Sequence, residues 1–168
     1  VAYQDKDVFL QKLEQMGLEK DSTFKGSWSL YALGFHHIKP VNFVSFFNAI
    51  ANGGKMVSLK SQDGSAIVVD SMIAEKKNIE SMLKAFRFFV TNGLGKKAES
   101  KMVNVAGISG IIHTDDGIYA DFCGYFPVEK PKYTVFVSYK RPEIPVSGGG
   151  MAGLTFRKIA EQIMKTCK

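Results

Sequence analysis

Three strand-like runs lie close together in the second half of the chain, and they restrict the fold more than any other feature. The runs are Lys101–His113, Ile118–Phe126 and Lys132–Lys140. They are joined by the turn Thr114–Gly117 and by a short link that contains Pro127 and Pro131, residues typical of turns. Connections this short join neighbouring antiparallel strands, so the pattern predicts a three-stranded meander.

Apolar residues at helical spacing predict four helices around these strands. They are Asp7–Met16 with Asp7 as its cap, Pro40–Asn52, Lys77–Thr91, and a final amphipathic helix after Gly148–Gly150. The final helix directs Leu154, Phe156, Ile159, Ala160, Ile163 and Met164 inward. A short helical turn is expected at Trp28–Leu33.

Two shorter strands, Lys55–Lys60 and Ala66–Asp70, are expected around the turn Gln62–Gly64. The simplest architecture is a sheet with helices packed on one face, which is the α+β class. We predict a single domain over residues 1–168. Residues 1–100 are expected to be mostly helical, and residues 101–168 are expected to form the sheet and the covering helix.

The composition fits such a domain. The chain has 168 residues, of which 45% are hydrophobic and 23% charged, as in ordinary globular domains. No apolar run is long enough to span a bilayer, and no signal-peptide pattern is visible, so we expect no membrane span. The sequence leaves open whether the chain is a complete short protein or a fragment of a longer one.

The net charge of +6 invites a nucleic-acid hypothesis. Proteins that bind nucleic acids gather their basic residues on one face, whereas the lysines here are scattered and the arginines are Arg87, Arg141 and Arg157. We therefore predict no nucleic-acid binding. A mildly basic surface also suits proximity to an anionic membrane or an acidic polymer.

The cysteines and histidines lack the spacing of a metal site. Cys123 falls in an apolar strand pattern and Cys167 lies near the C-terminus, and whether they are oxidised stays open. The histidines are His36, His37 and His113, and no cysteine or carboxylate has ligand spacing to them. We expect no metal and no cofactor.

Five segments in order resemble the C-terminal portion of the transpeptidase domain of class B penicillin-binding proteins, the division-type peptidoglycan D,D-transpeptidases. The segments are Phe47–Val57, Asn92–Ala98, Val105–Gly110, Ala120–Pro127 with Pro131–Tyr133, and Ser147–Ala152 with the helix that follows. The resemblance extends from about Ala32 to Met164. It implies a central antiparallel sheet beside a helical lobe, and a location in the periplasm or cell envelope.

The resemblance also implies a catalytic site, and most of that site is missing. The family uses an S-x-x-K nucleophile motif, an S-x-N triplet and a K-[ST]-G strand. Here the strand reads Ile108, Ser109, Gly110 and Ile111. Ser109 keeps the hydroxyl, Gly110 keeps room, and the N–H of Ile111 could face an oxyanion. Ile108 replaces the lysine, which removes a charged contact worth about 1.5–3 kcal/mol.

No S-x-N triplet occurs, and two S-x-x-K matches do. Ser81–Lys84 falls within a predicted core helix. Ser22–Lys25 is a weak candidate for nucleophile and base, because it lacks the family's preceding Pro-Gly and no helix follows it where the motif needs one. These departures favour ordinary strand residues over a working pocket at Ile108 and Ser109.

Three hypotheses follow for the function. The favoured one is a non-catalytic, degenerate or truncated transpeptidase-like domain of peptidoglycan synthesis or cell division. Its exposed apolar surface would form a homodimer or dock on a division-complex protein. The second is an active acyl-serine transpeptidase or β-lactam-reactive enzyme that uses Ser22 and Lys25. The third is an envelope module that binds protein or glycan such as peptidoglycan.

Overall fold

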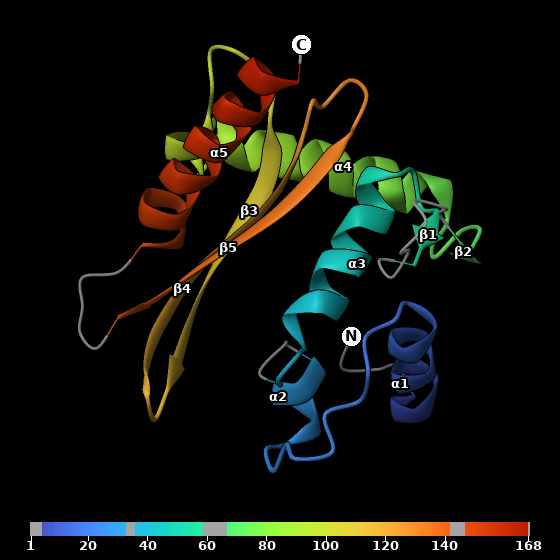
Figure 1. The fold of residues 1–168 in the computed structure, drawn as a ribbon. Helices are drawn as coiled ribbons and strands as arrows, with labels where there is room; N and C mark the ends of the chain where they lie inside the picture. Colours follow the sequence, from blue (N-terminus) through green and yellow to red (C-terminus); the bar gives the residue numbers. More distant parts are fainter. Residues whose placement is uncertain (1–4, 33–35, 59–66, 142–146, 168) are drawn as a thin grey trace.

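The structure, a computed structural model, describes residues 5–32, 36–58, 67–141 and 147–167. The helices are α1 (Lys6–Gln15), α2 (Trp28–Ala32), α3 (Pro40–Ala51), α4 (Lys76–Thr91) and α5 (Gly153–Thr166), with a short 3-10 helix η1 (Lys96–Ala98) and a π-helical turn η2 (Gly148–Ala152). The strands are β1 (Met56–Val57), β2 (Val68–Asp70), β3 (Ala106–Thr114), β4 (Gly117–Phe126) and β5 (Tyr133–Arg141). This arrangement confirms the predicted α+β class (Figure 1).

The meander is confirmed as an antiparallel sheet of order β3-β4-β5. In its register, Ile108 lies opposite Cys123, and Cys123 lies opposite Phe136. The first strand begins at Ala106, five residues later than predicted. Before it, the carbonyl of Asn104 accepts from the N–H of Val128, and the carbonyl of Val105 accepts from Arg87, so these groups are satisfied outside the β3-β4 pairing.

The predicted helices are confirmed to within one or two residues at their ends. The first helix begins at Lys6, and its cap is Asp5, which accepts a hydrogen bond from the N–H of Asp7 at 2.9 Å. The prediction that Asp7 caps this helix was therefore wrong. The two short strands pair antiparallel, and of the residues predicted in them that the structure describes, Lys55 and Ser58 lie outside the strands. Leu33 and residues 59–66, which include the turn Gln62–Gly64, lie outside the described residues.

Helix α5 covers one face of the sheet. β4 directs Phe122 and Phe126 toward it, and both pack with Phe156 of α5, whose exposed fraction is 0%. Gly124 allows this close approach, because a Cβ there would lie 2.7 Å from the Phe156 ring. The aromatic side chains of β4 and α5 thus form a closed core.

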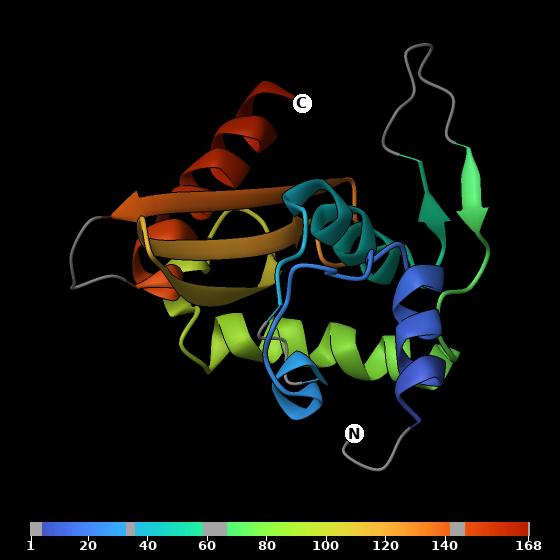
Figure 2. The ribbon, with the colours of Figure 1, turned by 90° about the horizontal axis from the view of Figure 1, so that it is seen from below.

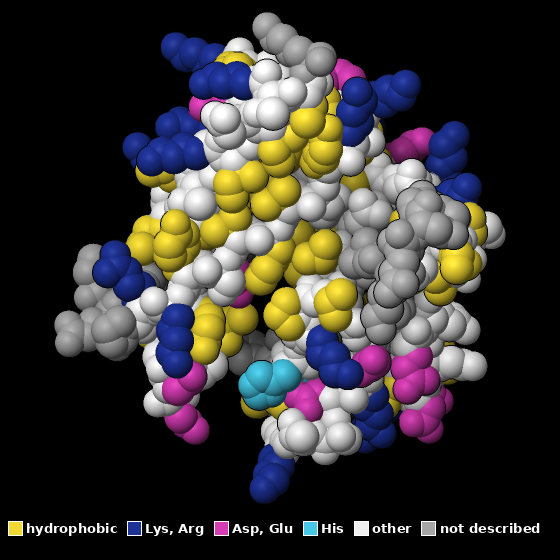
Figure 3. Space-filling view, in the orientation of Figure 1, with side chains coloured by type: hydrophobic (Ala, Val, Ile, Leu, Met, Phe, Trp, Pro, Cys, Tyr) yellow, Lys and Arg dark blue, Asp and Glu magenta, His cyan; other side chains and the backbone are white. Residues whose placement is uncertain are grey.

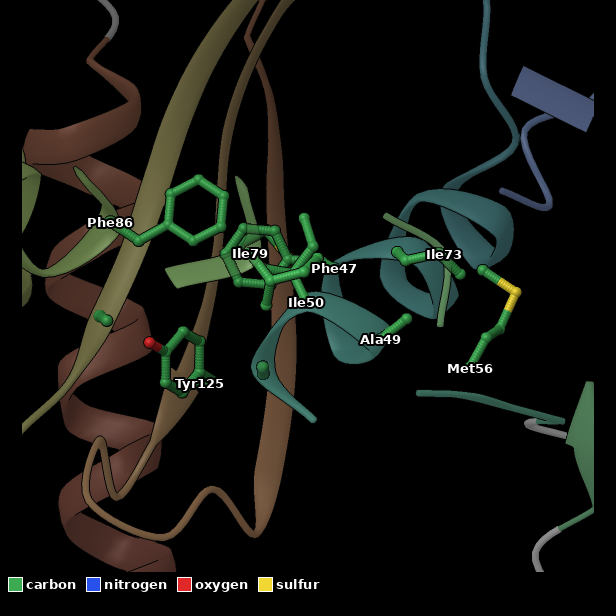
Figure 4. Close-up of a cluster of buried hydrophobic side chains, with 11 residues drawn as sticks. Phe47, Ala49, Ile50, Met56, Ile73, Ile79, Phe86 and Tyr125 are labelled. Atoms are coloured by element: carbon green, nitrogen blue, oxygen red, sulfur yellow. The ribbon is translucent and has the colours of Figure 1, made fainter. Parts of the chain in front are cut away.

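Helix α3 lies on the opposite face, so helices cover both faces and not one as the pattern predicted, and α4 runs along the β3 edge of the sheet, where it contributes side chains to both cores (Figure 2). Phe47 of α3 stacks on Phe86 of α4 with ring centroids 4.6 Å apart. Both belong to the core cluster that holds Cys123 and Tyr125 of β4 (Figure 4). Among the described residues, no helix is long and apolar enough to cross a membrane.

Candidate functional site

A cavity of about 560 Å³ opens on the face of the sheet that α3 covers, and α4 adds Met82 and Phe86 to its wall from the β3 edge. Its walls include Phe43 and Phe47 of α3, Phe86 of α4, and Ile108 and Phe136 of the sheet. Figure 3 shows hydrophobic side chains around a hollow in this region. The volume lies within the range of ligand-binding pockets, and most of the lining is apolar, as such pockets require.

The side chains of β4 point alternately to the two faces of the sheet, and the ones on the α3 face explain why the cavity is open at one end. On this face the strand presents Tyr119, Asp121, Cys123 and Tyr125 in turn. Cys123 and Tyr125 are each 1% exposed, because the aromatic rings of α3 and α4 pack over them. Tyr119 and Asp121 lie beyond these rings and line the cavity.

Gly110 adds to the open space. It lies opposite Asp121 in the register of β3 and β4, and a Cβ built on it would meet no atom within 4 Å. No positive φ explains a glycine here. The missing side chain therefore leaves the area beside Asp121 unfilled.

Asp121 is the charged residue of this cavity. It is half-buried, and its Oδ1 is fully buried without a hydrogen-bond partner among the described residues. Burial raises the pKa of the carboxyl above the ordinary value of 3.8, and a hydrogen bond from Ser138 on β5 opposes this shift to some extent. A buried carboxylate oxygen without a donor is costly, so burial here disfavours the charged form of Asp121.

The residues predicted at the K-[ST]-G position lie at this cavity. Ile108, Ser109 and Gly110 contribute to its wall, whereas Ile111 does not line it and is 48% exposed. Ile108 is on the same face as Cys123. Ser109 pairs with Phe122, so its side chain belongs to the α5 face, where a Cβ on Gly148 would lie 2.9 Å from its Cβ.

Ser22 and Lys25 lie elsewhere. They belong to the turn and irregular segment between α1 and α2, both are exposed, and neither lines the cavity. Asp21 organises this turn by accepting hydrogen bonds from Thr23 and His37. The segment does not place Ser22 and Lys25 on one helix face, which is the arrangement that lets an amine take the hydroxyl proton.

The other S-x-x-K match lies outside the cavity, whereas one histidine lines it. Ser81 donates a hydrogen bond from its hydroxyl to the carbonyl of Lys77 within α4 at 2.8 Å. His36 stacks on Tyr31 with ring centroids 4.1 Å apart and also lines the cavity, and His37 contacts Asp21. Cys123 is buried and Cys167 exposed, and both are free thiols. In the described ranges, no three His, Cys, Asp or Glu side chains gather as metal ligands would.

Sequence reasoning missed Asp121. A signal for it exists, because Asp121 is the single charged residue in the run from Ile118 to Phe126, which otherwise reads as a buried strand. A charge at such a position requires a partner or a function. The cavity beside Asp121 is formed by segments that lie far apart in the sequence, so no local sequence pattern predicts it.

Known proteins share this architecture. The family model of the penicillin binding protein transpeptidase domain matches residues 2–165. The transpeptidase domain of the FtsI4 D,D-transpeptidase of Legionella pneumophila is similar at 27% identity and a TM-score of 0.72, over 94% of this chain and 61% of that chain. A peptidoglycan glycosyltransferase from Burkholderia ambifaria is similar at 19% identity and a TM-score of 0.77, over 98% of this chain and 57% of that chain.

A third solved structure, the transpeptidase domain of penicillin-binding protein 3 from Burkholderia pseudomallei, is similar at 17% identity and a TM-score of 0.76. This match covers 98% of this chain and 59% of that chain. Among curated protein sequences, no match was found. The chain thus spans about three fifths of the length of these solved structures.

Proposed function

The chain belongs to the penicillin-binding protein transpeptidase domain family, and from this premise we propose that it acts in peptidoglycan synthesis as a portion of such a domain that carries no acyl-transfer chemistry of its own. The observation that supports this proposal is the wall of the cavity at β3. Ile108 stands there where the family has a lysine, beside Ser109 and Gly110. We propose a location in the cell envelope for the same reason.

The electrostatics of the cavity oppose an anionic substrate. No lysine or arginine is among the described residues that line it, and the charged group present is the Asp121 carboxylate. A substrate carboxylate would lose a charge-assisted contact of about 1.5–3 kcal/mol and would meet a like charge. Acyl transfer also requires a nucleophile within hydrogen-bond reach of a base, and Ser22 and Lys25 lie outside this cavity.

Labelling with a fluorescent penicillin, read by gel and by intact mass, tests this proposal. We expect no adduct on the chain under conditions that label a complete, active transpeptidase domain in parallel. An adduct that survives denaturation and disappears in Ser22→Ala would contradict the proposal and make Ser22 the nucleophile. An adduct that disappears in Ser109→Ala would contradict it equally and place the chemistry on β3.

A second candidate function, an envelope binding module, is supported by the cavity itself. Its apolar walls and its single carboxylate resemble a binding site more than a site for anionic acyl donors. Retention on purified peptidoglycan tests it. Gly110→Val is a matched variant, since its side chain would enter open space and fill some of the cavity. Retention that falls in this variant would favour glycan binding through the cavity.

A further inference from the structure

Two exposed apolar side chains and three lysines gather at the C-terminal end of α4, away from the cavity. Phe88 has an exposed fraction of 63% and Leu94 one of 85%, the two highest values among the large hydrophobic side chains that the structure describes. Lys84, Lys96 and Lys97 are exposed beside them in the sequence. We propose that these five residues, the α4 patch, form a surface that docks on an anionic lipid bilayer.

Backbone hydrogen bonds bring the two apolar side chains of the patch to one place. The N–H of Gly93 donates to the carbonyl of Phe88 at 3.1 Å. The N–H of Gly95 donates to the carbonyl of Phe89, also at 3.1 Å. The residues around Leu94 are thus folded back onto the last turn of α4, which carries Phe88.

The exposure of Leu94 is built into this loop. Gly95 is buried against the ring of Phe89, since a Cβ on Gly95 would lie 2.6 Å from that ring. The carbonyl oxygen of Leu94 lies against η2, since a Cβ on Gly149 would be 2.3 Å from it. The backbone is therefore packed on the protein while the leucine side chain extends into water, which is unfavourable for an apolar group. Adjacent apolar side chains held in water mark a contact surface.

The charge of the patch selects an anionic partner. The run from Ser81 to Ala98 contains the three lysines and Arg87, and it contains no aspartate or glutamate. Arg87 pairs with Glu99, whereas the three lysines form no ion pair with a carboxylate in the ranges that the structure describes. Their charges are therefore available to a partner.

The combination of apolar side chains with lysines favours a bilayer over a soluble polyanion. Lysines alone bind any anionic polymer, but an exposed phenylalanine and leucine gain nothing from a hydrated one. At a bilayer surface, apolar side chains enter the boundary between the headgroups and the acyl chains. Lysines at the same surface reach the anionic headgroups while their hydrocarbon stems stay in the apolar boundary.

Co-sedimentation of the full chain with lipid vesicles tests the proposal. One set of vesicles contains phosphatidylcholine alone, and the other contains equal parts of phosphatidylcholine and phosphatidylglycerol. We expect binding to the anionic vesicles to be more than about tenfold tighter than binding to the neutral ones, and high salt should release the chain because it screens exposed charges. Equal binding to the two sets would overturn the proposal.

Matched pairs of lysine variants separate the patch from the net charge. Lys96→Gln together with Lys97→Gln should weaken binding about twentyfold, since each lysine near an anionic surface contributes about fivefold. Lys12→Gln together with Lys20→Gln removes the same charge from exposed positions outside the patch and should have a much smaller effect. Equal effects of the two pairs would overturn the proposal, because binding would then follow the net charge alone.

The apolar contact is measured separately. Leu94→Ser should weaken binding about tenfold, because the bilayer no longer removes a leucine from water. Ile67→Ser, at a side chain with an exposed fraction of 62% beside β2, is the control and should bind as the wild type does. Phe88→Ser is the second variant if Leu94→Ser does not fold, and circular dichroism confirms the folding of each. Undiminished binding of the folded serine variants would overturn the proposal and assign the lysines to a soluble polyanion.

Insertion into the bilayer has a spectroscopic readout. In Leu94→Trp, brominated lipid should quench the fluorescence of the introduced indole, and the wild-type chain, whose one tryptophan is Trp28, is the reference. An indole that brominated lipid does not quench would contradict the proposal. No residue of the α4 patch lines the cavity, so these outcomes do not depend on the proposed function.

Discussion

The two faces of strand β4 differ in how completely this chain covers them. Toward α5, the strand presents Ala120, Phe122 and Phe126, all with an exposed fraction of 0%. Toward α3 and α4, it presents Cys123 and Tyr125, which are buried, and Asp121, which borders the cavity. One strand with one backbone geometry thus supports a closed core and an open one.

The difference shows which packing the chain completes by itself. Helix α5 follows β5 in the sequence and supplies Phe156 and Ala160 to the closed face. On the other face the rings of Phe47 and Phe86 reach Tyr125 but do not extend to the end at Asp121. The closed face therefore carries more of the stability, and the open face leaves apolar side chains in contact with the cavity.

The largest expected effect is the cost of truncating an aromatic ring on each face. Phe156→Ala should lower the free energy of unfolding by about 3–5 kcal/mol, because it leaves a cavity in a close-packed core. Phe43→Ala should cost about 1–2 kcal/mol, because its ring already borders open space and less contact is lost. Urea unfolding of both variants measures this ratio. Equal costs would mean that both faces are equally closed in solution.

Two strand glycines offer a smaller test of the same contrast. Gly124→Ala should lower the free energy of unfolding by about 1–3 kcal/mol, because its Cβ would lie 2.7 Å from the Phe156 ring and 2.8 Å from the carbonyl oxygen of Ala106. Gly110→Ala should be neutral or stabilise by up to about 1 kcal/mol. No atom lies within 4 Å of the new Cβ, and the unfolded chain loses conformational entropy when alanine replaces glycine. Thermal unfolding midpoints check both signs. A costly Gly110→Ala would show that the cavity is filled in solution.

The sequence was sufficient for the sheet, the helices and the family. Period-two alternation with short turns defined β4 and β5 to within one residue. Helical spacing defined α3 and α4 equally well, and the family model matches residues 2–165 around the predicted resemblance. These features depend on local patterns, which a single sequence displays directly.

The rest depends on contacts between distant segments. Asp5 and Asp7 are both good caps by residue type, and only the hydrogen bond between them decides which residue begins the helix. The start of β3 depends on Arg87, which lies in another element. The cavity joins α3, α4 and all three strands of the sheet, so the environment of Asp121 was not predictable from the run around it.

Arg87 holds α4 to the segment that leads into β3, and its removal should have a moderate effect. Its guanidinium donates to both carboxylate oxygens of Glu99 at 3.0 Å and to the carbonyl of Val105 at 2.7 Å. Arg87→Met should lower the free energy of unfolding by about 1–2 kcal/mol, since partly exposed charged hydrogen bonds are lost. Lys84→Met, on the exposed side of the same helix, is the control and should change little. Chemical denaturation measures both, and matching values would show that Arg87 does not hold α4 in place.

The smallest expected effect is a difference in pH dependence between two carboxyl groups. Burial raises the pKa of Asp121 above 3.8, so its charged form opposes folding at neutral pH. Asp121→Asn should stabilise the chain at neutral pH by less than about 1 kcal/mol, because the group is partly solvated, and this gain should vanish as the pH falls below the ordinary pKa.

The carboxyl of Asp116, at the β3-β4 turn, has the opposite pH dependence. Hydrogen bonds from Lys140 and Thr114 lower its pKa to about 2, so it stabilises the fold above 3.8 and loses this contribution as the pH falls toward 2. Asp116→Asn should therefore destabilise the chain at neutral pH and have no effect at acidic pH. Unfolding midpoints measured across this pH range test the two signs. A stabilising carboxylate at Asp121 would contradict this sign and would mean that the open face supplies its own cation.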